Sequence, residues 1–425
     1  MGKRPFLEHH LTVYRKKMKL TSYLKGFGFA LIFRPFYPIM DQSSILPEGA
    51  RSSMKRFGAS VLLLLLLPLL AGCAGTTQAA TPSAPAATAG APKLSRYSVV
   101  FMDTFDTVIS LIGFAESEEV FNQQAAVAHQ LFVDLHKRFD CYNSYEDEGI
   151  VSVYTVNEKA PDGPVAVDPI LYALLKFSKA HYEEAHGQTN VALGSVLSIW
   201  HDYREAGLAD PDSAALPPAE LLSAASQHAD ISGLILDDEA LTVAFADPSL
   251  RLDVGAVAKG YAAEIVAKAL LGGPMPSFII SAGGNVRMGN PPADGRANWG
   301  VGIQDPDGAI LGTTDIVETL YLHDCSVVTS GDYQRYYTVD GTNYCHLIDP
   351  DTLMPGTFYR SVSIVTEDSG YADLLSTAAY LMPYEESRGF IEGLDGVEAL
   401  WLFADGTIEM TDGLAAAAKS RGAVN

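Results

Sequence analysis

Residues 252–261 read Leu-Asp-Val-Gly-Ala-Val-Ala-Lys-Gly-Tyr. The apolar start predicts a short buried strand that breaks at Gly255, and the remainder predicts a helix that runs to about Leu271 and is stopped by a pair of glycines. The first turn of such a helix offers unpaired backbone N–H groups, the positive end of the helix dipole and the amine of Lys259. These features predict a phosphate or pyrophosphate site. A common strand-to-helix junction with a solvated lysine is the alternative.

Strands and helices alternate irregularly on both sides of this junction. Two β-rich stretches fill residues 99–114, and apolar residues at helical spacing predict a helix over 117–139. Asp168 followed by proline predicts the start of a second helix, with Gly187 as its stop. Short strands dominate after residue 234, with further helices after Asp373 and over 384–392. This order predicts an α+β fold, with mixed sheets and packed helices in a single body.

Composition excludes several classes of protein. The chain has 425 residues, 48% of them apolar and 19% charged, so it can bury a large core and is not a disordered or fibrous protein. Its formal charge of −22 argues against nucleic acid as a partner, because phosphate backbones require a basic footprint. Residues 1–72 nevertheless hold eleven lysines and arginines against three acids, a net charge of +8 that leaves −30 on the remainder. The basic head and the acidic body therefore need separate explanations.

The basic head is typical of an export signal. Lys55 and Arg56 precede an apolar run over residues 61–70, which is too short to span a bilayer core of about 30 Å. Residues 70–73 read Leu-Ala-Gly-Cys and resemble the lipobox of bacterial lipoproteins, which predicts lipidation of Cys73. An ordinary signal peptide with an incidental cysteine is the alternative.

These features predict how the chain is divided. Because an export signal normally lies at the start of a protein, residues 1–53 are interpreted as an over-extended gene start and residues 54–72 as the signal peptide. Residues 73–95 form a lipidated, Ala/Thr/Pro-rich tether that cannot bury a core, and residues 96–425 form the folded body. The protein is therefore expected outside the cytoplasm, anchored to a membrane by lipid.

The three cysteines of the body are scattered. Cys141, Cys325 and Cys345 show neither a CxxC pair nor the spacing of a zinc site. At most one disulfide is possible, and buried thiols are the favoured interpretation. This pattern argues against a thiol-based redox or iron protein.

A glycine pair ends a second segment of interest. Residues 277–285 read Ser-Phe-Ile-Ile-Ser-Ala-Gly-Gly-Asn, which predicts a buried strand followed by Gly283 and Gly284. Glycines at this place let backbone approach a ligand closely, and a simple tight turn is the alternative.

A third segment combines hydroxyls, an acid and a histidine. Residues 327–333 read Val-Val-Thr-Ser-Gly-Asp-Tyr and contain Ser330, and residues 344–350 contain His346. These groups suit the orientation of a phosphate and the movement of a proton. A structural histidine is the alternative for His346.

A fourth segment carries potential ligands for a metal ion. Residues 372–377 place Asp373 at the start of a predicted helix with Thr377 four positions later, so that both oxygens lie on one helical face. Hard oxygen ligands of this kind suit Mg²⁺. Read alone, Asp373 is better explained as a helix N-cap.

Taken in order, the four segments resemble the motifs of the ApbE family of flavin transferases, whose members are commonly bacterial lipoproteins. The resemblance covers about residues 97–412. Upstream, Phe105-Asp106-Thr107 stands where the family has Met-Gly-Thr, and residues 187–192 stand where many members have Gly-Ala-Phe-Asp-Val-Thr.

The resemblance implies a T-fold-like architecture, an activity and a set of site residues. ApbE enzymes use Mg²⁺ to split FAD and attach the FMN half to a Ser or Thr of an acceptor redox protein, releasing AMP. The implied metal ligands are the carbonyl of Ala256 and the side chains of Asp373 and Thr377, and the implied catalytic residues are Asp373 and His346. The implied FAD-binding residues are Phe105, Tyr145, Gln188, Thr189, Asn190, Asp253, Lys259, Gly283, Gly284, Ser330 and His346.

Three functions remain open from the sequence: an FAD:protein FMN transferase, an FAD pyrophosphatase that uses water as acceptor, and a lipoprotein that binds FAD without catalysis. An anionic substrate on so acidic a body must depend on local positive features rather than on long-range attraction. The sequence therefore predicts that FAD binding depends strongly on Mg²⁺.

Overall fold

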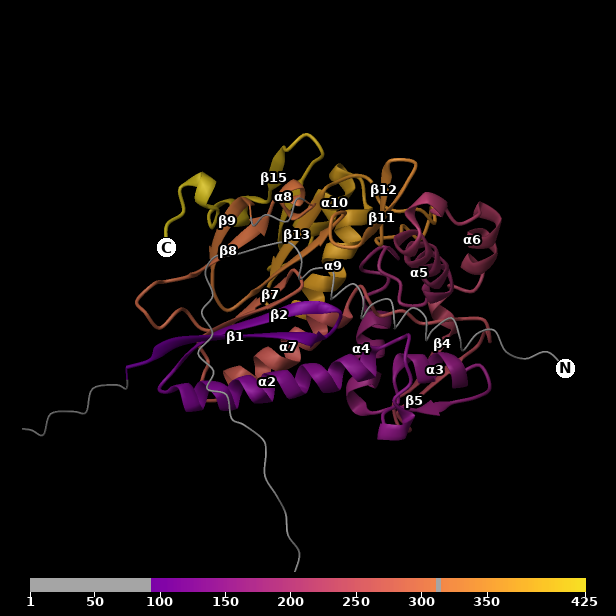
Figure 1. The fold of residues 1–425 in the computed structure, drawn as a ribbon, viewed down its shortest axis with the longest axis horizontal. Coiled ribbons are helices and arrows are strands. Elements are labelled where there is room, and N and C mark those ends of the chain that lie inside the picture. Colours follow the sequence, from indigo (N-terminus) through magenta and orange to yellow (C-terminus); the bar gives the residue numbers. More distant parts are fainter. Residues whose placement is uncertain (1–92, 311–314) are drawn as a thin grey trace, which may run out of the picture. The chain divides into compact units, whose positions relative to one another are not determined.

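The structure, a computed structural model, describes residues 93–310 and 315–425 (Figure 1). The predictions for the extended start, the signal peptide, Cys73 and the tether as far as residue 92 lie outside the described residues. The first strand begins at Ser95. Among the helices of the described residues, none is both long and apolar enough to cross a membrane.

The elements follow one another irregularly, as expected for an α+β chain. The strands are β1 (Ser95–Thr104), β2 (Thr107–Ala115), β3 (Val165–Ala166), β4 (Leu234–Asp237), β5 (Thr242–Phe245), β6 (Phe278–Ala282), β7 (Asn285–Met288), β8 (Trp299–Gln304), β9 (Ile316–Leu322), β10 (Ser326–Gly331), β11 (Tyr336–Val339), β12 (Thr342–Cys345), β13 (Ser361–Thr366), β14 (Glu398–Leu402) and β15 (Ile408–Met410). The α-helices are α2 (Glu118–Phe139), α3 (Val153–Lys159), α4 (Pro169–Ala180), α5 (Gly194–Ala209), α6 (Ala219–Ser226), α7 (Ala258–Leu271), α8 (Pro306–Ile310), α9 (Ser369–Leu381), α10 (Tyr384–Glu392) and α11 (Asp412–Ala415). Single 3-10 turns occupy Glu146–Glu148, Pro211–Ser213, Ile231–Gly233 and Lys419–Arg421.

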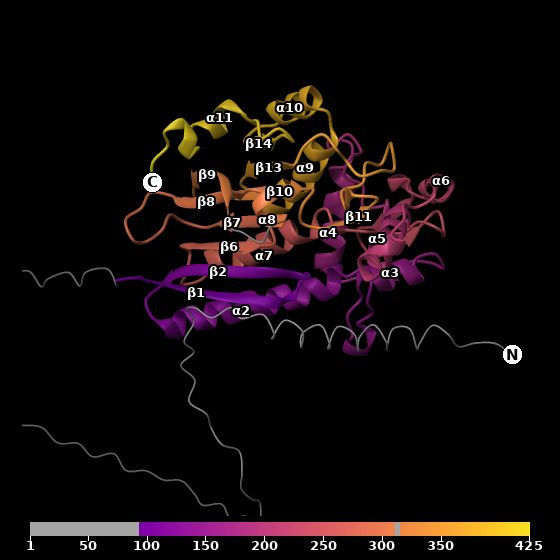
Figure 2. The same cartoon turned by 45° about the horizontal axis from the view of Figure 1, so that its top comes forward.

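An eight-stranded antiparallel sheet organises the folded body. Its strand order is β1-β2-β6-β7-β10-β13-β14-β15, so β1 is an edge strand and the β6–β7 hairpin lies near the middle. Helix α7 packs against α2 on one side and α9 on the other, and the three helices cover one face of the sheet (Figures 1 and 2). The β8–β9 hairpin and the C-terminal segment cover part of the opposite face.

Successive side chains along a strand point to opposite faces of the sheet, and apolar side chains on the two faces form two separate hydrophobic cores. On β14, Trp401 belongs to the core under the helices, whereas its neighbours Leu400 and Leu402 belong to the core under the β8–β9 hairpin. A strand buried on both faces needs apolar residues at successive positions, which is why β14 reads Glu-Ala-Leu-Trp-Leu.

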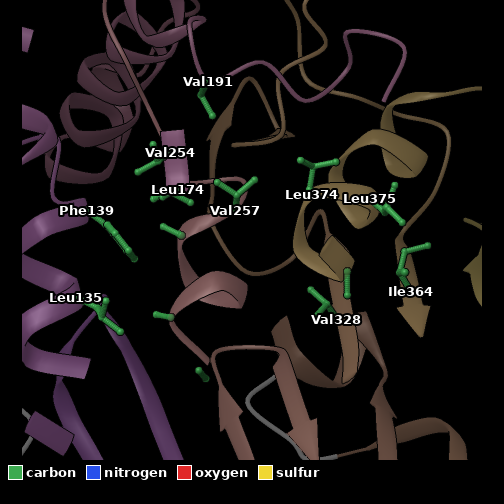
Figure 3. Close-up of a cluster of buried hydrophobic side chains, with 14 of the residues drawn as sticks. Leu135, Phe139, Leu174, Val191, Val254, Val257, Val328, Ile364, Leu374 and Leu375 are labelled. Atoms are coloured by element: carbon green, nitrogen blue, oxygen red, sulfur yellow. The ribbon is translucent and has the colours of Figure 1, made fainter. Parts of the chain in front are cut away.

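Figure 3 shows how distant segments contribute to the larger core. Leu135 of α2, Leu174 of α4, Val257 before α7, Val328 of β10 and Leu374 of α9 all belong to it and are fully or almost fully buried. Each such side chain contributes roughly 1.5–3 kcal/mol through burial. This core fixes the start of α7 relative to α9, and both helices carry predicted site residues.

Smaller elements form a lobe beside the sheet. The three-stranded sheet β3-β5-β4 and the helices α3 to α6 belong to this lobe (Figure 1). Side chains of α5 and α6 pack on the β11–β12 hairpin around Trp200 and Tyr337. The hairpin thereby brings the segment that follows it, including His346, against the main sheet.

Several predicted elements are confirmed. Helix α2 has Ser117 as its N-cap, since the Ser117 side chain accepts a hydrogen bond from the Val120 N–H. Asp168 caps α4 and Pro169 is its first residue. Helix α10 spans Tyr384–Glu392, as predicted. The three described cysteines are free thiols, of which Cys345 is buried and the other two partly so.

Three local predictions are wrong. Helix α4 ends at Ala180 rather than at Gly187, because residues 181–187 fold into turns that require positive φ at His186 and Gly187. Residues 252–254 are not a strand: the Asp253 N–H donates to the Val191 carbonyl, and its carboxylate accepts the Gly255 N–H at 2.8 Å. A carboxylate that bonds the backbone two residues on favours a turn over an extended strand.

The third correction concerns Asp373, which is neither the start nor the N-cap of its helix. Helix α9 begins four residues earlier, and Asp368 caps it by accepting the N–H groups of Gly370 and Tyr371 at 2.8 and 3.1 Å. Asp373 lies in the second turn, where its carboxylate is not needed to cap the helix. The ordinary structural explanation of this residue is thereby removed.

Candidate active site

A pocket of about 760 Å³ opens where α7 begins, beside α9 and the β6–β7 turn. Its volume lies within the roughly 300–1,000 Å³ range of small-molecule and cofactor sites. Almost all the residues predicted to bind substrate or metal line it: Phe105, Gln188, Thr189, Asn190, Asp253, Ala256, Lys259, Gly283, Gly284, Ser330, His346, Asp373 and Thr377. Tyr145 does not. The fold thus brings segments far apart in the sequence to one cavity.

Tyr145 takes part in a structural cluster beside the pocket. Its hydroxyl donates to the Asp140 carboxylate at 2.8 Å, and the Lys137 ammonium lies 5.7 Å from the centre of its ring. Tyr142, three residues earlier, lines the pocket instead, and its ring stacks on that of His201 with 4.4 Å between the centroids. The predicted aromatic group is therefore present at the pocket, but Tyr142 supplies it.

The stacked partner of Tyr142 comes from α5, which the sequence did not mark as part of the site. His201 Nδ1 lies 2.9 Å from the Arg204 guanidinium, and both residues line the pocket. Because a guanidinium only donates, Nδ1 of His201 is the acceptor. Burial, followed by the charge of Arg204, lowers the pKa of His201. A neutral imidazole and a tyrosine ring thus form an aromatic surface with a fixed cation at its edge.

The start of α7 and the second turn of α9 meet at Asp373. The backbone N–H of Gly260 belongs to the first turn of α7, where N–H groups lack intrahelical partners, and it donates to the Asp373 carboxylate at 2.8 Å. The Asp373 side chain is only 4% exposed, and burial raises its pKa, whereas the charge of Lys259 and the Gly260 hydrogen bond act in the opposite direction. A buried carboxylate beside a lysine is suited to hold a cation that comes with an anionic ligand.

The oxygen atoms of Asp373, Thr377 and Ala256 are of the chemical kind that Mg²⁺ prefers. Thr377 lies one turn later on the same helix and lines the same pocket, and its hydroxyl is 3.5 Å from that of Ser330. Within the described residues, the Ala256 carbonyl accepts no hydrogen bond. One carboxylate, one hydroxyl and one carbonyl are hard ligands, and Mg²⁺ commonly completes its shell with substrate phosphates and water. Accordingly, residues 93–310 and 315–425 contain no cluster of three or more His, Cys, Asp or Glu that could hold a metal.

His346 presents a neutral imidazole to the pocket. Its Nδ1 lies 3.2 Å from the Arg335 carbonyl, and because a carbonyl only accepts, Nδ1 carries the hydrogen and Nε2 keeps its lone pair. The ring lines the pocket and is partly exposed. Burial, together with the charges of Arg335 and Lys259, lowers its pKa to about 3. His346 is therefore uncharged at neutral pH and able to accept a proton.

Two residues of the segment 188–190 make structural hydrogen bonds, and the third presents an unpartnered oxygen. The Thr189 hydroxyl donates to the Leu374 carbonyl at 2.8 Å, and the Asn190 amide bonds two backbone groups at 2.9 Å each. These bonds hold the segment against α9 and the neighbouring lobe. Gln188 differs, because its Oε1 is buried without a hydrogen-bond partner. That oxygen is free for a ligand of the pocket.

The tight turn, the alternative offered for Gly283 and Gly284, is present. They form the two-residue turn between β6 and β7 with φ values of 58° and 97°, which is the left-handed geometry that favours glycine. A Cβ atom on Gly283 would lie 2.2 Å from the Thr107 hydroxyl, so the two hairpin tips touch. Because the turn also lines the pocket, backbone forms part of its wall.

Three cations line the pocket of an otherwise acidic body: Lys259, Arg204 and Arg335. The Lys259 amine donates no hydrogen bond within the described part of the chain, so it is available to a ligand. The sequence marked only Lys259, because an isolated arginine carries no local signal of which cavity it faces. Four aspartates, Asp106, Asp140, Asp253 and Asp373, line the same pocket, so the three cations do not give it a net positive charge.

Replacing Gly260 is expected to disrupt the site together with the fold. A Cβ atom there would lie 2.1 Å from the Ser369 carbonyl and 2.5 Å from Asp373 Cβ, so α7 and α9 could not approach as closely. Overpacking typically costs about 1–3 kcal/mol, and a clash with backbone places Gly260→Ala at the upper end of that range. Thermal unfolding should show the loss. Gly272→Ala is the matched control: its Cβ would meet nothing nearer than 3.5 Å, and we expect its stability to be unchanged.

Comparison with solved structures defines the class of this fold and site. The ApbE protein of Thermotoga maritima is 26% identical and has a TM-score of 0.65, with 75% of this chain and 98% of that chain covered. The flavin transferase ApbE of Vibrio cholerae shares the fold at 21% identity and a TM-score of 0.61. The body is thus an α+β protein of the ApbE type, which confirms the predicted fold class.

Comparison of sequences identifies the family. The ApbE family model matches residues 102–401. The FAD:protein FMN transferase of Treponema pallidum is 33% identical over 298 residues, which cover 68% of this chain and 80% of that protein. An FAD:protein FMN transferase of Klebsiella pneumoniae is 26% identical over 296 residues, covering 69% and 87%. The chain belongs to the ApbE family.

Proposed function

We propose that this chain is an Mg²⁺-dependent FAD:protein FMN transferase, which attaches FMN by a phosphoester bond to a Ser or Thr of an acceptor redox protein and releases AMP. Its relatives in Treponema pallidum and Klebsiella pneumoniae carry that enzyme name. The observation that carries the proposal is the junction of α7 and α9, where a helix N-terminus, Lys259, buried Asp373 and neutral His346 line one pocket.

The residues at this junction suit binding of a pyrophosphate. The Lys259 amine and the positive end of the α7 dipole lie at one end of the pocket. The N–H groups of Ala258 and Gly260 are already bonded, to the Val254 carbonyl and the Asp373 carboxylate, so Lys259 supplies the main positive charge there. Asp373, Thr377 and the Ala256 carbonyl would hold Mg²⁺, which when bound neutralises charge on the phosphate oxygens. Phosphoryl transfer depends mostly on positioning and charge neutralisation, so this arrangement meets its main requirement.

The remaining requirement is a group that takes the proton of the acceptor hydroxyl. The hydroxyl oxygen forms a bond to the phosphorus of the FMN half, and the bond from that phosphorus to the bridging oxygen breaks, so AMP leaves with that oxygen. Nε2 of His346 is the available base, because Nδ1 is engaged by the Arg335 carbonyl. The neutral ring keeps the lone pair of Nε2, so Nε2 can take this proton as the new phosphoester bond forms.

One experiment distinguishes the three functions left open by the sequence. The purified full chain is incubated with FAD, Mg²⁺ and a protein whose flavinylation site contains Ser-Gly-Ala-Thr. Covalent flavin fluorescence on that protein is the expected result. Free FMN and AMP without a labelled acceptor would indicate a pyrophosphatase instead, and unchanged bound FAD would indicate storage.

Removal of the metal should weaken FAD binding. With a net charge of −30 on residues 73–425, the pocket has only its local cations to offset the pyrophosphate. We expect excess chelator to raise the dissociation constant of FAD at least about 10-fold, equivalent to about 1.4 kcal/mol, measured by quenching of flavin fluorescence. Equal affinity with and without Mg²⁺ would contradict the metal assignment. Riboflavin, which lacks the pyrophosphate, is the control whose binding should not respond to chelator.

We also propose that the protein acts outside the cytoplasm as a lipid-anchored enzyme. The support is the sequence alone: a basic segment, a short apolar run and the Leu-Ala-Gly-Cys motif that ends at Cys73. Cys73→Ser should move the enzyme from the membrane fraction to a soluble or unprocessed form in the native host. Detection of peptides from residues 1–53 by mass spectrometry would contradict the proposed start at Met54.

A further inference from the structure

An uncovered strip lies on the sheet face opposite the helices. The strip consists of Val100 and Met102 of β1, Val108 and Ser110 of β2, and Ser281 of β6. Strand register places Val100 opposite Ser110, and Ser110 opposite Ser281, so these side chains share one face. Val108 joins them by alternation along β2, and Met102 lies next to Val100's end of the strip, where the register of β1 shifts between Phe101 and Thr104. The three apolar members are unusually exposed, at 53% for Val100, 76% for Met102 and 55% for Val108. None of the five residues is charged.

The same face is well covered only a few residues away. Ile112 and Ile279 pair across β2 and β6 and pack into the core under the β8–β9 hairpin. The strip is therefore the end of an apolar face that the hairpin leaves open. Three exposed apolar side chains side by side are more than scattered surface residues and indicate a contact site.

The strip is continuous with the pocket. Ser281 belongs to both, and Thr107 and Gly283, which lie next to the strip at the hairpin tips, also line the cavity. The pocket further includes Val286, Val327 and Val301, which belong to the core under the β8–β9 hairpin. The cavity thus reaches around the β6–β7 turn, from the helix face with its cations to the opposite, apolar face of the sheet.

The two ends of this cavity differ in chemistry. Lys259, Asp373 and His346 lie at the helix end, where the charged pyrophosphate fits. The sheet end offers valines, serine and glycine backbone, which suit an uncharged segment with small side chains. An acceptor chain must reach the phosphorus without displacing the nucleotide, and the sheet end provides a separate approach.

We infer that the strip is the docking surface for the acceptor protein, whose uncharged, small-residue segment lies across the sheet and places its hydroxyl at the β6–β7 turn. This inference rests on the proposed function. It adds the side from which the acceptor arrives: nucleotide on the helix face and acceptor on the sheet face, with the glycine turn between them. A second copy of the chain seated on the strip would cover the entry to the pocket, so a partner that takes part in the reaction is the better occupant.

A charge placed on the strip should impair transfer without affecting the nucleotide site. For Met102→Glu and Val108→Glu we expect the KM for the Ser-Gly-Ala-Thr acceptor protein to rise at least about 10-fold, while the dissociation constant of FAD stays within about twofold of wild type. Ile235→Glu, at a residue of β4 that is 50% exposed, is the matched control and should change neither value. Met102→Leu should retain wild-type transfer.

Other outcomes overturn the inference. Unchanged acceptor KM in both glutamate variants would show that the strip does not bind the acceptor. Parallel loss of FAD binding would assign the strip to the nucleotide site, and a wild-type dimer that the variants dissociate would assign it to a second copy. If wild-type enzyme transfers no FMN, the proposed function fails, and hydrogen exchange of β1 and β2 in the FAD-loaded chain, with and without the acceptor protein, still decides: protection supports docking, and unchanged exchange refutes it.

Discussion

We expect Asp373→Ala to reduce FMN transfer by about 10³-fold, equivalent to about 4 kcal/mol of transition-state stabilisation. The carboxylate is buried, faces the pocket and accepts the Gly260 N–H, so no neighbouring side chain can replace its charge. Initial rates of acceptor labelling at saturating FAD and Mg²⁺ measure the loss. Asp373→Asn should lose nearly as much, because the amide can still accept the Gly260 hydrogen bond but no longer carries a charge.

The helix cap provides the control for this prediction. Asp368→Ala removes the carboxylate that caps α9 and should cost about 1 kcal/mol of stability, with transfer close to wild type. Asp373→Asn should show the reverse: large loss of activity and modest change in melting temperature. Transfer by Asp373→Ala at near wild-type rate in the presence of Mg²⁺ would show that the metal assignment is wrong.

The second large effect is expected at His346. Loss of a positioned general base typically costs 10²–10⁴-fold, so His346→Gln should lower kcat by about that factor and leave FAD affinity within about twofold. Glutamine keeps a side chain of similar size that can bond the Arg335 carbonyl but cannot accept the proton. Stopped assays of labelled acceptor give kcat, and fluorescence quenching gives the affinity. A variant with full kcat would assign His346 a structural role.

The pH profile tests the charge state of this histidine. Because burial lowers the pKa of His346 from 6.5 to about 3, the wild-type rate should show no loss centred near pH 6.5 as the solution is acidified. Stability should respond in a defined direction: the unfolded chain gains a proton on His346 below pH 6.5 that the folded chain does not, so the free energy of unfolding falls as pH falls towards 3. His346→Gln should remove this contribution. An activity loss near pH 6.5 that disappears in the variant would contradict the neutral assignment.

The local sequence predicted those turns and helix starts in which a particular backbone conformation favours a particular residue type. Gly283 and Gly284 lie at positive φ because a two-residue turn demands it, and Pro169 follows an N-cap because its fixed φ suits a first helical turn. The apolar spacing that predicted α2 is also a local signal, because residues three, four or seven positions apart share one face of a helix. Such signals involve residues a few positions apart, so no knowledge of the fold was needed.

The conformation of Phe105 and Asp106 could not be predicted from local sequence. Both adopt positive φ, at 54° and 48°, in the turn between β1 and β2, where the family has Met-Gly. A phenylalanine in this conformation is strained, and its surroundings hold it there: the Phe105 N–H donates to His136 Nδ1 at 3.2 Å, and its carbonyl accepts from Arg335 at 3.3 Å. The sequence placed Phe105 at the site but gave no indication of this turn.

The sequence by itself identified the family and the fold class, because the motifs that carry the resemblance are short runs of neighbouring residues. All but one of the residues that the resemblance assigned to substrate or metal line the pocket, but most of the pocket wall is formed by residues that the sequence did not mark. Only the tertiary structure decided what those residues do there. It placed Tyr142 rather than Tyr145 at the pocket, gave the cap of α9 to Asp368, and left Asp373 to meet Gly260, 113 positions away in the chain. It also set the neutral state of His346 and exposed the strip beside the β6–β7 turn. Burial, hydrogen bonding across the chain and exposure arise from packing, which no local pattern of residues specifies.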